Sequence, residues 1–385
     1  MKNHQNKKAR LGQCLAIVFY ALIGVFCGIL IVMYLERAET QGMSMKSQIL
    51  AFLLLFIAMY AIMLVQIVIH EAGHLLFGLM TGYRFCSFRI LQFMWVRSDD
   101  RIRFKRLHLA GTGGQCLMAP PDLTDGTMPV QLYNYGGSIL NAISAVVFLG
   151  ISLLCPAGSL SRTILLLFTV IGFAFAVMNG LPLRIGPVNN DGCNARDLAR
   201  DPESVRAFWT QMKVNELISE GVRLKDMPEE WFTVPSDEAM RNGITATVGL
   251  LACNRLMDEH RFEEADRLME HMLSLDSGVA GLARNLTVCD RIYVELIGRN
   301  RSEALDTLMS REQKKIMKAM RTNPSVLRTE YACALIARRD TAEAEKTLKA
   351  FNRAIETYPY PGEIQAEQEL IALAQQAQTP AQTEA

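Results

Sequence analysis

The chain has 385 residues, 50% of them hydrophobic, and its formal net charge at pH 7 is +1. A charge this close to zero argues against a nucleic-acid-binding protein and against an acid-rich disordered chain, so no nucleic-acid partner is expected. The nine cysteines stand singly, without a CxxC pair, which argues against a disulfide framework and a cysteine zinc site. The apolar residues concentrate before about residue 180, so two domains are expected.

Four apolar segments are predicted to cross a membrane. The first, residues 12–34, follows a basic N-terminal segment and is too long for the apolar core of a secretory signal peptide, which is the rival interpretation. The second, residues 49–80, would be roughly 48 Å long as one helix, so it must tilt, bend or protrude. Residues 137–154 and 163–180 supply two further spans.

The distribution of basic residues predicts the orientation of these spans. Lysines and arginines are frequent in the N-terminal segment and in the loop between the second and third spans. The opposite side has only Arg37, Lys46 and Arg162. Because basic residues mark cytoplasmic segments, we expect a multi-pass protein of the plasma membrane whose N-terminus and C-terminal domain are both cytoplasmic.

The second span contains the sequence HEAGH, in which His70 and His74 lie four residues apart. On a helix this spacing puts both imidazoles on one face, where they can bind one zinc ion. Glu71 is placed to accept a proton from zinc-bound water. A chance match is the alternative, but ionisable side chains at membrane depth are costly and usually functional. Gln66 lies one turn earlier, either as a satisfied polar neighbour or as a residue that supports the site.

A catalytic zinc usually has three protein ligands. His108, in the basic loop, is one candidate for the third, and Asp191, beyond the fourth span, is the better placed one. The second and fourth spans run in the same direction, so their C-terminal ends lie on the same side of the membrane. Pro182 and Gly186 break the chain before Asp191 and could turn it back toward the histidines. The alternative for Asp191 is a helix cap or a turn before Gly192.

These motifs together resemble the site-2 proteases, a family of intramembrane zinc metalloproteases. The resemblance covers about residues 50–200 and rests on HEAGH, on GGSILNAISA (residues 136–145), and on NGLP followed by DG. It implies cleavage of transmembrane substrates, zinc bound by His70, His74 and Asp191, and Glu71 as general base. Asn141 and Asn179 match family asparagines near the catalytic centre; each could instead be an ordinary hydrogen bond between helices.

One spacing departs from the commonest form of the family. There the aspartate follows the second asparagine by about eight residues, whereas here Asn179 and Asp191 are twelve apart. A longer loop is compatible with metal binding, but it leaves the register of the intervening residues open.

Residues 83–120 alternate apolar and basic side chains around an acidic turn, which predicts a β-hairpin on the cytosolic side. The glycines of GTGG are the alternative signal of a phosphate loop, but the absence of a following GK[ST] argues against it. Site-2 proteases hold the substrate as an added strand, and an exposed edge here could do so. The alternative is a basic amphipathic hairpin that rests on anionic headgroups of the lipid bilayer.

Beyond about residue 200 the sequence predicts helices, and three stretches look alike. Their central alanines, Ala265, Ala304 and Ala344, are 39 and 40 residues apart, slightly more than a tetratricopeptide repeat of about 34 residues. We expect tetratricopeptide-like helical hairpins with a groove for a cytosolic peptide or protein ligand. The alternative is a helical cap without a partner.

The predicted fold is mainly α: a polytopic membrane domain with about four spans and a β-hairpin insertion, followed by an all-α helical-repeat domain. The expected function is zinc-dependent intramembrane proteolysis of membrane-protein substrates. One alternative is a membrane-anchored scaffold without catalysis; another is a peptidase that processes small exported peptides. The predicted regions are a tail, first span and external loop (1–48), a metalloprotease core (49–200), a cytosolic repeat domain (201–372) and a disordered tail (373–385).

Overall fold

Long apolar runs and short capped helices divide this chain into two parts with different surfaces. The computed structural model describes residues 2–98, 101–107, 113–182, 189–279 and 281–378, with side chains from residue 16 onward. It is mainly helical, with 72% of the residues in helices. Contacts group the chain into a first unit, Met1–Arg84 with Met128–Asp201, and a second unit, Phe85–Thr127 with Pro202–Ala385.

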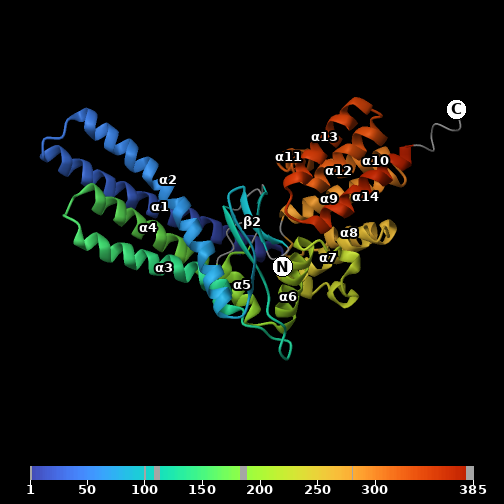
Figure 1. Ribbon diagram of the computed structural model, residues 1–385, viewed down its shortest axis with the longest axis horizontal. Helices are drawn as coiled ribbons and strands as arrows, with labels where there is room; N and C mark the ends of the chain where they lie inside the picture. Colours follow the sequence, from blue (N-terminus) through green and yellow to red (C-terminus); the bar gives the residue numbers. More distant parts are fainter. Residues whose placement is uncertain (1, 99–100, 108–112, 183–188, 280, 379–385) are drawn as a thin grey trace. The chain divides into compact units, whose positions relative to one another are not determined.

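Four long helices and one short helix build the first unit (Figure 1). In chain order they are α1 (Lys2–Thr40), α2 (Met45–Met80), α3 (Gln131–Leu154), α4 (Leu160–Gly180) and α5 (Asp191–Leu198). Within the described residues, four stretches are long and apolar enough to cross a membrane: Ala16–Thr40, Met45–Met80, Gln131–Leu154 and Leu160–Gly180. The predicted apolar spans are therefore confirmed as helices of membrane-crossing length.

Serine residues fix where two of these helices begin. The Ser44 hydroxyl accepts a hydrogen bond from the Ser47 amide at 3.3 Å at the start of α2. Ser159 accepts from the Arg162 amide at 3.2 Å at the start of α4. Each bond satisfies one of the amides that lack a partner in the first turn of a helix.

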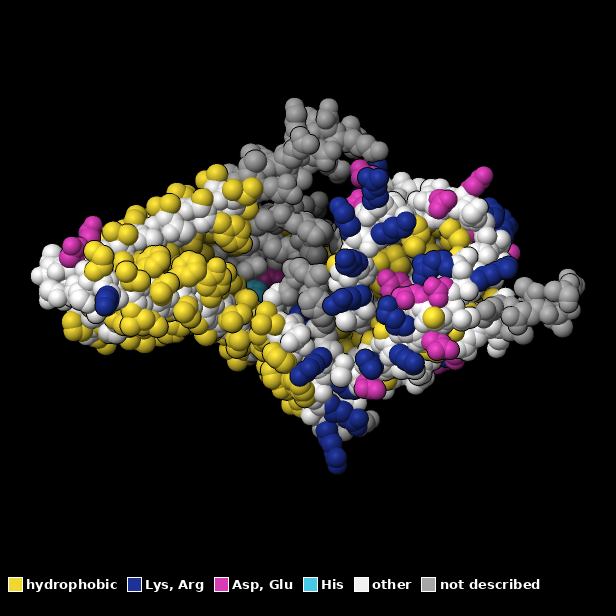
Figure 2. Space-filling view, turned by 90° about the horizontal axis from the view of Figure 1, so that it is seen from above, with side chains coloured by type: hydrophobic (Ala, Val, Ile, Leu, Met, Phe, Trp, Pro, Cys, Tyr) yellow, Lys and Arg dark blue, Asp and Glu magenta, His cyan; other side chains and the backbone are white. Residues whose placement is uncertain are grey.

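Side chains at the centre of the bundle join α1, α2 and α4. Ile31, Leu55, Ile62 and Leu167 belong to one buried apolar cluster. Other large apolar side chains of the same helices point outward, and Figure 2 shows them as a nearly continuous hydrophobic surface. Helices that are apolar all round are typical of membrane spans, because lipid contacts the outward face.

A four-stranded sheet replaces the predicted β-hairpin, and that prediction was too simple. The strands are β1 (Arg84–Ile90), β2 (Phe93–Ser98), β3 (Arg101–Arg106) and β4 (Gly114–Ala119), in the order β3-β2-β1-β4. The stretch RFCSFRILQFMWV forms two strands because the chain turns at Leu91, which has a positive φ of 53°. The buried Arg89 guanidinium supports this turn by donating to the Leu91 carbonyl at 2.6 Å.

The rest of the second unit is helical. Its helices are α6 (Pro202–Ser219), η1 (Leu224–Asp226), η2 (Glu229–Phe232), η3 (Ala239–Arg241), α7 (Gly243–Asp258), α8 (Phe262–Ser274), α9 (Gly281–Ile297), α10 (Ser302–Leu308), α11 (Arg311–Ala319), α12 (Pro324–Ala332), η4 (Cys333–Ala337), α13 (Thr341–Thr357) and α14 (Pro361–Gln378). Ala265 lies on α8, Ala304 on α10 and Ala344 on α13. Their assignment to tetratricopeptide-like repeats stays a prediction.

Two features of this unit differ from the predicted domain boundaries. Met94, Val96 and Leu107 of the sheet share a core cluster with Tyr358, so the sheet packs with the C-terminal helices and the unit is not all-α. Helix α14 continues to Gln378, whereas the sequence predicted disorder from residue 373. It continues because Ala374, which is 0% exposed, still packs into the helical core.

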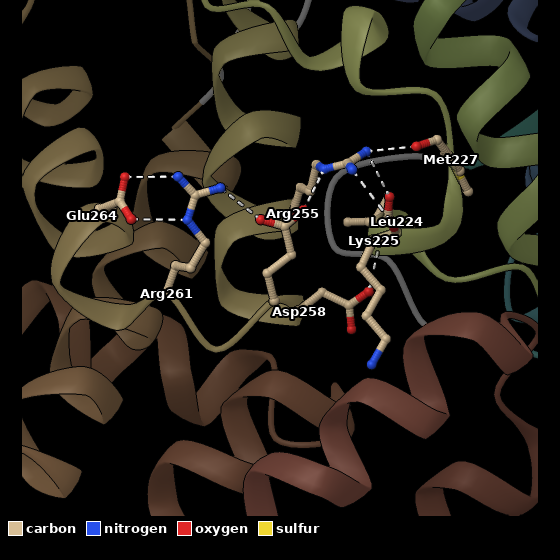
Figure 3. Close-up of polar contacts among 8 residues, drawn as sticks. Leu224, Lys225, Met227, Arg255, Asp258, Arg261 and Glu264 are labelled. Carbon is tan, nitrogen blue, oxygen red and sulfur yellow. Dashed lines mark hydrogen bonds and ion pairs between the residues drawn. The ribbon is translucent and has the colours of Figure 1, made fainter.

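Arg255 on α7 holds the irregular segment that precedes this helix (Figure 3). Its guanidinium donates to the carbonyls of Leu224, Lys225 and Met227 at 3.2, 3.3 and 2.7 Å. The Lys225 amide in turn donates to a carboxylate oxygen of Asp258 at 3.0 Å. Charged side chains of α7 thus bind backbone groups of η1 and of the residue that follows it.

A buried charge network joins α9, α12 and α14. Arg328 is 0% exposed and pairs with Asp290 and, at 3.0 Å, with Glu367. Its guanidinium also lies over the Tyr293 ring, 4.4 Å from the centroid. Burial raises the pKa of Glu367 to about 7, and the carboxylates of Asp290 and Glu363 add to this, while Arg328 lowers it.

The raised pKa of Glu367 predicts a pH-dependent stability. The folded state binds the proton more tightly than the unfolded chain, so this contribution is complete below the ordinary glutamate pKa and is lost as pH rises through about 7. The unfolding free energy of wild type should fall between about pH 5 and about pH 8. In Glu367→Gln, which cannot titrate at this position, we expect this fall to be smaller by about 1–3 kcal/mol. Tryptophan fluorescence should follow this, because Trp95, Trp209 and Trp231 all lie in the second unit.

Glu345→Gln is the control, because Glu345 is an exposed residue of α13. It should leave the wild-type pH dependence unchanged. An equal pH dependence in wild type and Glu367→Gln would contradict the role of Glu367.

Candidate metal centre

Helix α2 brings two imidazoles together at a buried point of the first unit. His70 and His74 are 8% and 7% exposed, and their Nε2 atoms are 3.3 Å apart. Glu71, between them in sequence, is 7% exposed. One helical turn separates the two histidines, so the helix itself aligns both rings on one face.

Asp191, the first residue of α5, completes this cluster. Its Oδ2 atom lies 3.0 Å from Nε2 of His70 and 3.4 Å from Nε2 of His74. Within the described part of the chain, these three residues form the one group of this kind whose ligand atoms all lie within 4.8 Å of one another. The structure therefore brings together the three predicted ligands. The alternative ligand, His108, lies outside the described residues.

Asn190 positions Asp191 against the end of α4. Its side-chain amide donates to the carbonyls of Met178 and Leu181 at 2.7 and 2.6 Å. Its Oδ1 accepts from the Cys193 amide at 2.9 Å and so caps α5. Sequence analysis missed this residue, although the dipeptide Asn-Asp before a glycine is a signal for a helix cap.

The outer nitrogens of both imidazoles contact oxygen atoms. Nδ1 of His70 lies 2.8 Å from Oδ1 of Asn141, and Nδ1 of His74 lies 2.8 Å from the carbonyl of Tyr133. The Asn141 amide nitrogen donates to the carbonyl and to Oε1 of Gln66 at 3.0 and 2.7 Å, which fixes its Oδ1 as the atom facing His70. Since a carbonyl oxygen only accepts, both rings carry their proton on Nδ1 and direct a lone pair from Nε2.

Three acceptor atoms thus converge without a donor between them: two imidazole Nε2 atoms and Oδ2 of Asp191. This carboxylate oxygen is buried and makes no hydrogen bond among the described residues. Lone pairs this close repel one another, so the arrangement is suited to a shared cation.

The distances also fit the face of a small tetrahedron. Metal–nitrogen bonds of about 2.0–2.1 Å in tetrahedral geometry place ligand atoms about 3.3 Å apart. The three separations here are 3.0, 3.3 and 3.4 Å. These residues could therefore hold one metal ion with a fourth position open.

The two predicted asparagines occupy different places. Asn141 accepts a hydrogen bond from the imidazole of His70 and so orients that ring. Asn179 donates to the carbonyl of Phe175 in its own helix at 3.0 Å, and no hydrogen bond joins it to the three ligands among the described residues. Gln66, whose role the sequence left open, is 0% exposed and joins Asn141 to the Phe168 carbonyl of α4 at 3.3 Å. Gln66 therefore supports the site indirectly, by holding the side chain of Asn141.

Glycines let α2 and α3 approach closely enough for these contacts. A Cβ at Gly73 would lie 2.3 Å from the Gly136 carbonyl oxygen, and one at Gly136 would lie 2.6 Å from the Gly73 carbonyl oxygen. A Cβ at Gly137 would lie 2.4 Å from the His70 ring. Small residues at such crossings are typical of packed membrane helices.

Comparisons of the chain with protein-family models, with curated proteins and with solved structures found no match.

The helix crossing gives a prediction with a matched control. Alanine is favoured over glycine in a helix by about 1 kcal/mol, so Gly150→Ala, whose Cβ meets nothing within 4 Å, should be neutral or stabilising. Gly73→Ala should instead destabilise the bundle by about 2 kcal/mol or more, because the contacted atoms are backbone and cannot move aside. Thermal unfolding of the purified chain in detergent measures both. Equal effects of the two substitutions would exclude a tight crossing at Gly73.

The hydrogen bond that Asn141 accepts from His70 gives a prediction about metal affinity. Asn141→Ala removes the acceptor that holds His70, and loss of such a supporting contact lowers metal affinity by about 10–100-fold. Competition with a chelator of known affinity measures this. Asn179→Ala is the control and should leave the affinity unchanged, since Asn179 bonds within its own helix. A comparable loss in both variants would contradict the assignment.

Proposed function

We propose that this chain is a membrane-embedded zinc metalloendopeptidase of the site-2 protease type, which cleaves transmembrane or membrane-associated proteins. The observation that carries the proposal is the convergence of three buried acceptor atoms, from His70, His74 and Asp191, in a unit with four helices of membrane-crossing length. Buried acceptors without a donor are costly unless a cation joins them.

Zinc is the metal that suits this set of ligands. Imidazole is a good ligand for zinc, and two histidines with one carboxylate are a common catalytic set. Three protein ligands leave a fourth position for water, whereas structural zinc sites usually have four protein ligands. The separations of the ligand atoms agree with tetrahedral coordination.

Glu71 is the proposed general base. A zinc ion bound here would lower the pKa of a water molecule and polarise the scissile carbonyl. Glu71 accepts the proton of the attacking water and passes it to the leaving nitrogen. Asn141 and the Tyr133 carbonyl hold the two imidazoles in the tautomer that directs Nε2 inward.

The substrate must present its peptide bond in an extended form, because the bonds of an intact helix are already hydrogen-bonded and enclosed. Pairing with a sheet edge would provide such a form. We therefore propose substrates whose membrane helix unwinds easily into an extended segment.

The cytoplasmic side is the proposed location of the site. His70 and His74 precede the end of α2 at Met80 by ten and six residues, so they lie roughly 15 Å and roughly 9 Å from that end. Asp191 follows the C-terminal end of α4, which runs in the same direction through the membrane as α2. The basic residues of the sequence favour a cytoplasmic position for these ends in the plasma membrane.

Replacing Glu71 tests the mechanism. Glu71→Gln keeps the size of the side chain but cannot take a proton, so we expect cleavage to fall by about 100-fold or more while zinc stays bound. The measurement compares which membrane proteins accumulate uncleaved in cells that express wild type, Glu71→Gln or the control Glu39→Gln, an exposed residue of α1.

The zinc content of the variants distinguishes a metal ligand from the general base. Purified wild type and Glu71→Gln should each contain one zinc per chain, and His74→Ala should contain much less. A wild-type protein without stoichiometric zinc, or unchanged cleavage by Glu71→Gln, would overturn the proposal.

A further inference from the structure

A cavity of about 450 Å³ lies in the second unit. Its lining residues come from the sheet region and from the C-terminal helices. β3 contributes Arg106, the segment just before α12 contributes Arg321 and Asn323, and the C-terminal half of α13 contributes Arg353. The Lys105 ammonium donates to the Glu356 carbonyl at 3.4 Å, which ties the edge strand to the last turn of α13. Small-molecule sites typically have volumes of about 300–1,000 Å³.

Among the described residues, the charged side chains that line the cavity are all positive. Arg106, Arg321 and Arg353 all line it, and none of its lining residues is an aspartate or glutamate. Among the described residues none of these three guanidinium groups makes an ion pair. Other arginines of the same unit do pair with carboxylates, which shows that acidic partners are common here: Arg223, Arg255, Arg261, Arg291, Arg301 and Arg328.

The beginning of α12 adds to the positive potential. Asn323 lines the cavity and is the N-cap of this helix, with its Oδ1 accepting from the Ser325 amide at 3.0 Å. The unpaired amides of a first helical turn carry partial positive charge and favour anions. Thr322 and Thr357 supply hydroxyl groups at the same cavity. Positive charge and hydrogen-bond donors therefore come from three separate segments.

Apolar side chains form another part of the wall. Leu107, Leu327 and Ala354 line the cavity together with Tyr358, which is 8% exposed. The Tyr358 hydroxyl is already bonded to Glu363 at 2.5 Å, so the ring rather than the hydroxyl is available to a ligand. A ligand that fills this cavity needs an anionic group and a less polar body.

We propose that this cavity binds a small phosphorylated molecule, with its phosphate held by Arg106, Arg321 and Arg353 and its organic part against Leu107, Leu327 and Tyr358. Guanidinium groups bind phosphate oxygens in pairs of parallel hydrogen bonds, and a phosphate monoester carries nearly two negative charges. The ligand comes either from solution or from a phosphorylated lipid headgroup. The site is independent of the metal centre and of the proposed proteolysis.

Binding of inorganic pyrophosphate to the full chain in detergent tests the charges. We expect saturable binding by calorimetry that weakens with salt, since the arginines are exposed. The double variant Arg321→Gln, Arg353→Gln should bind at least about tenfold more weakly. The control Arg267→Gln, on α8 and outside the cavity, should bind as wild type does. Equal binding by the double variant and wild type, or no saturable binding by wild type, would overturn the proposal.

A second variant separates a defined cavity from general charge attraction. Ala350 lines the cavity on α13, and Ala350→Tyr fills part of it while every charge remains. It should lose pyrophosphate binding to a similar extent, and wild-type binding by this variant would contradict a cavity site. Citrate should bind much more weakly than pyrophosphate; equal affinity would contradict selection for phosphate. Tryptophan fluorescence confirms that each variant keeps the unfolding transition of wild type.

The source of the ligand is tested in nanodiscs of phosphatidylcholine, with and without a phosphatidylinositol phosphate. Loss of pyrophosphate binding only in the discs that contain the phosphorylated lipid supports a lipid headgroup as ligand. Unchanged binding in both discs supports a soluble phosphate ester.

Discussion

The close crossing of α2 and α3 is the contact on which the metal centre depends. At Gly73 and Gly136 the two backbones lie nearer than any side chain would allow. This approach places the Tyr133 carbonyl and the Asn141 amide within 2.8 Å of the two imidazoles. A wider crossing would lengthen both hydrogen bonds at once and free the rings to rotate. The glycines therefore act on the chemistry through the helix spacing, without contacting a ligand atom except at Gly137.

The same crossing explains why polar side chains are stable among apolar helices. Gln66, Asn141 and the imidazole of His70 form a continuous chain of hydrogen bonds that ends at the Phe168 carbonyl of α4. Each buried group in this chain has a partner, which removes most of the cost of placing it away from water. Among the described atoms of the cluster itself, the three inward-facing acceptors of His70, His74 and Asp191 have no donor, and these are the atoms that we assign to the metal.

Much of this arrangement could be predicted from the sequence, because its signals are local. The apolar runs gave the four long helices, and the i, i+4 spacing of the histidines placed both on one face. Asp191 could be selected from the direction of the spans. Its anchoring by Asn190 and the Gln66–Asn141 hydrogen bond could not be predicted, since both depend on contacts between residues distant in the sequence.

The sheet shows where local signals fail. Nothing in RILQF marks a turn, because neither glycine nor proline is present, and the positive φ of Leu91 is supported by the Arg89 side chain. The sheet also packs against Tyr358, more than two hundred residues later in the chain. The local pattern of apolar residues cannot predict such a distant contact. The cavity at that junction was likewise invisible in the sequence, where its three arginines stand far apart.

The two histidines are oriented by chemically different acceptors, and this has a consequence for sequence divergence. Position 133 offers a backbone carbonyl, which every amino acid possesses, so the hydrogen bond to His74 does not depend on the side chain there. The Tyr133 ring has a separate packing role, because it is buried, stacks on Tyr83 and lies beside the His74 ring. Position 141 offers a side-chain oxygen of one particular length that is also held by Gln66. Over evolutionary time, the hydrogen bond to His74 should therefore survive a change of side chain at 133, whereas the bond to His70 should not survive most changes at 141, and changes at 141 should be accompanied by changes at 66.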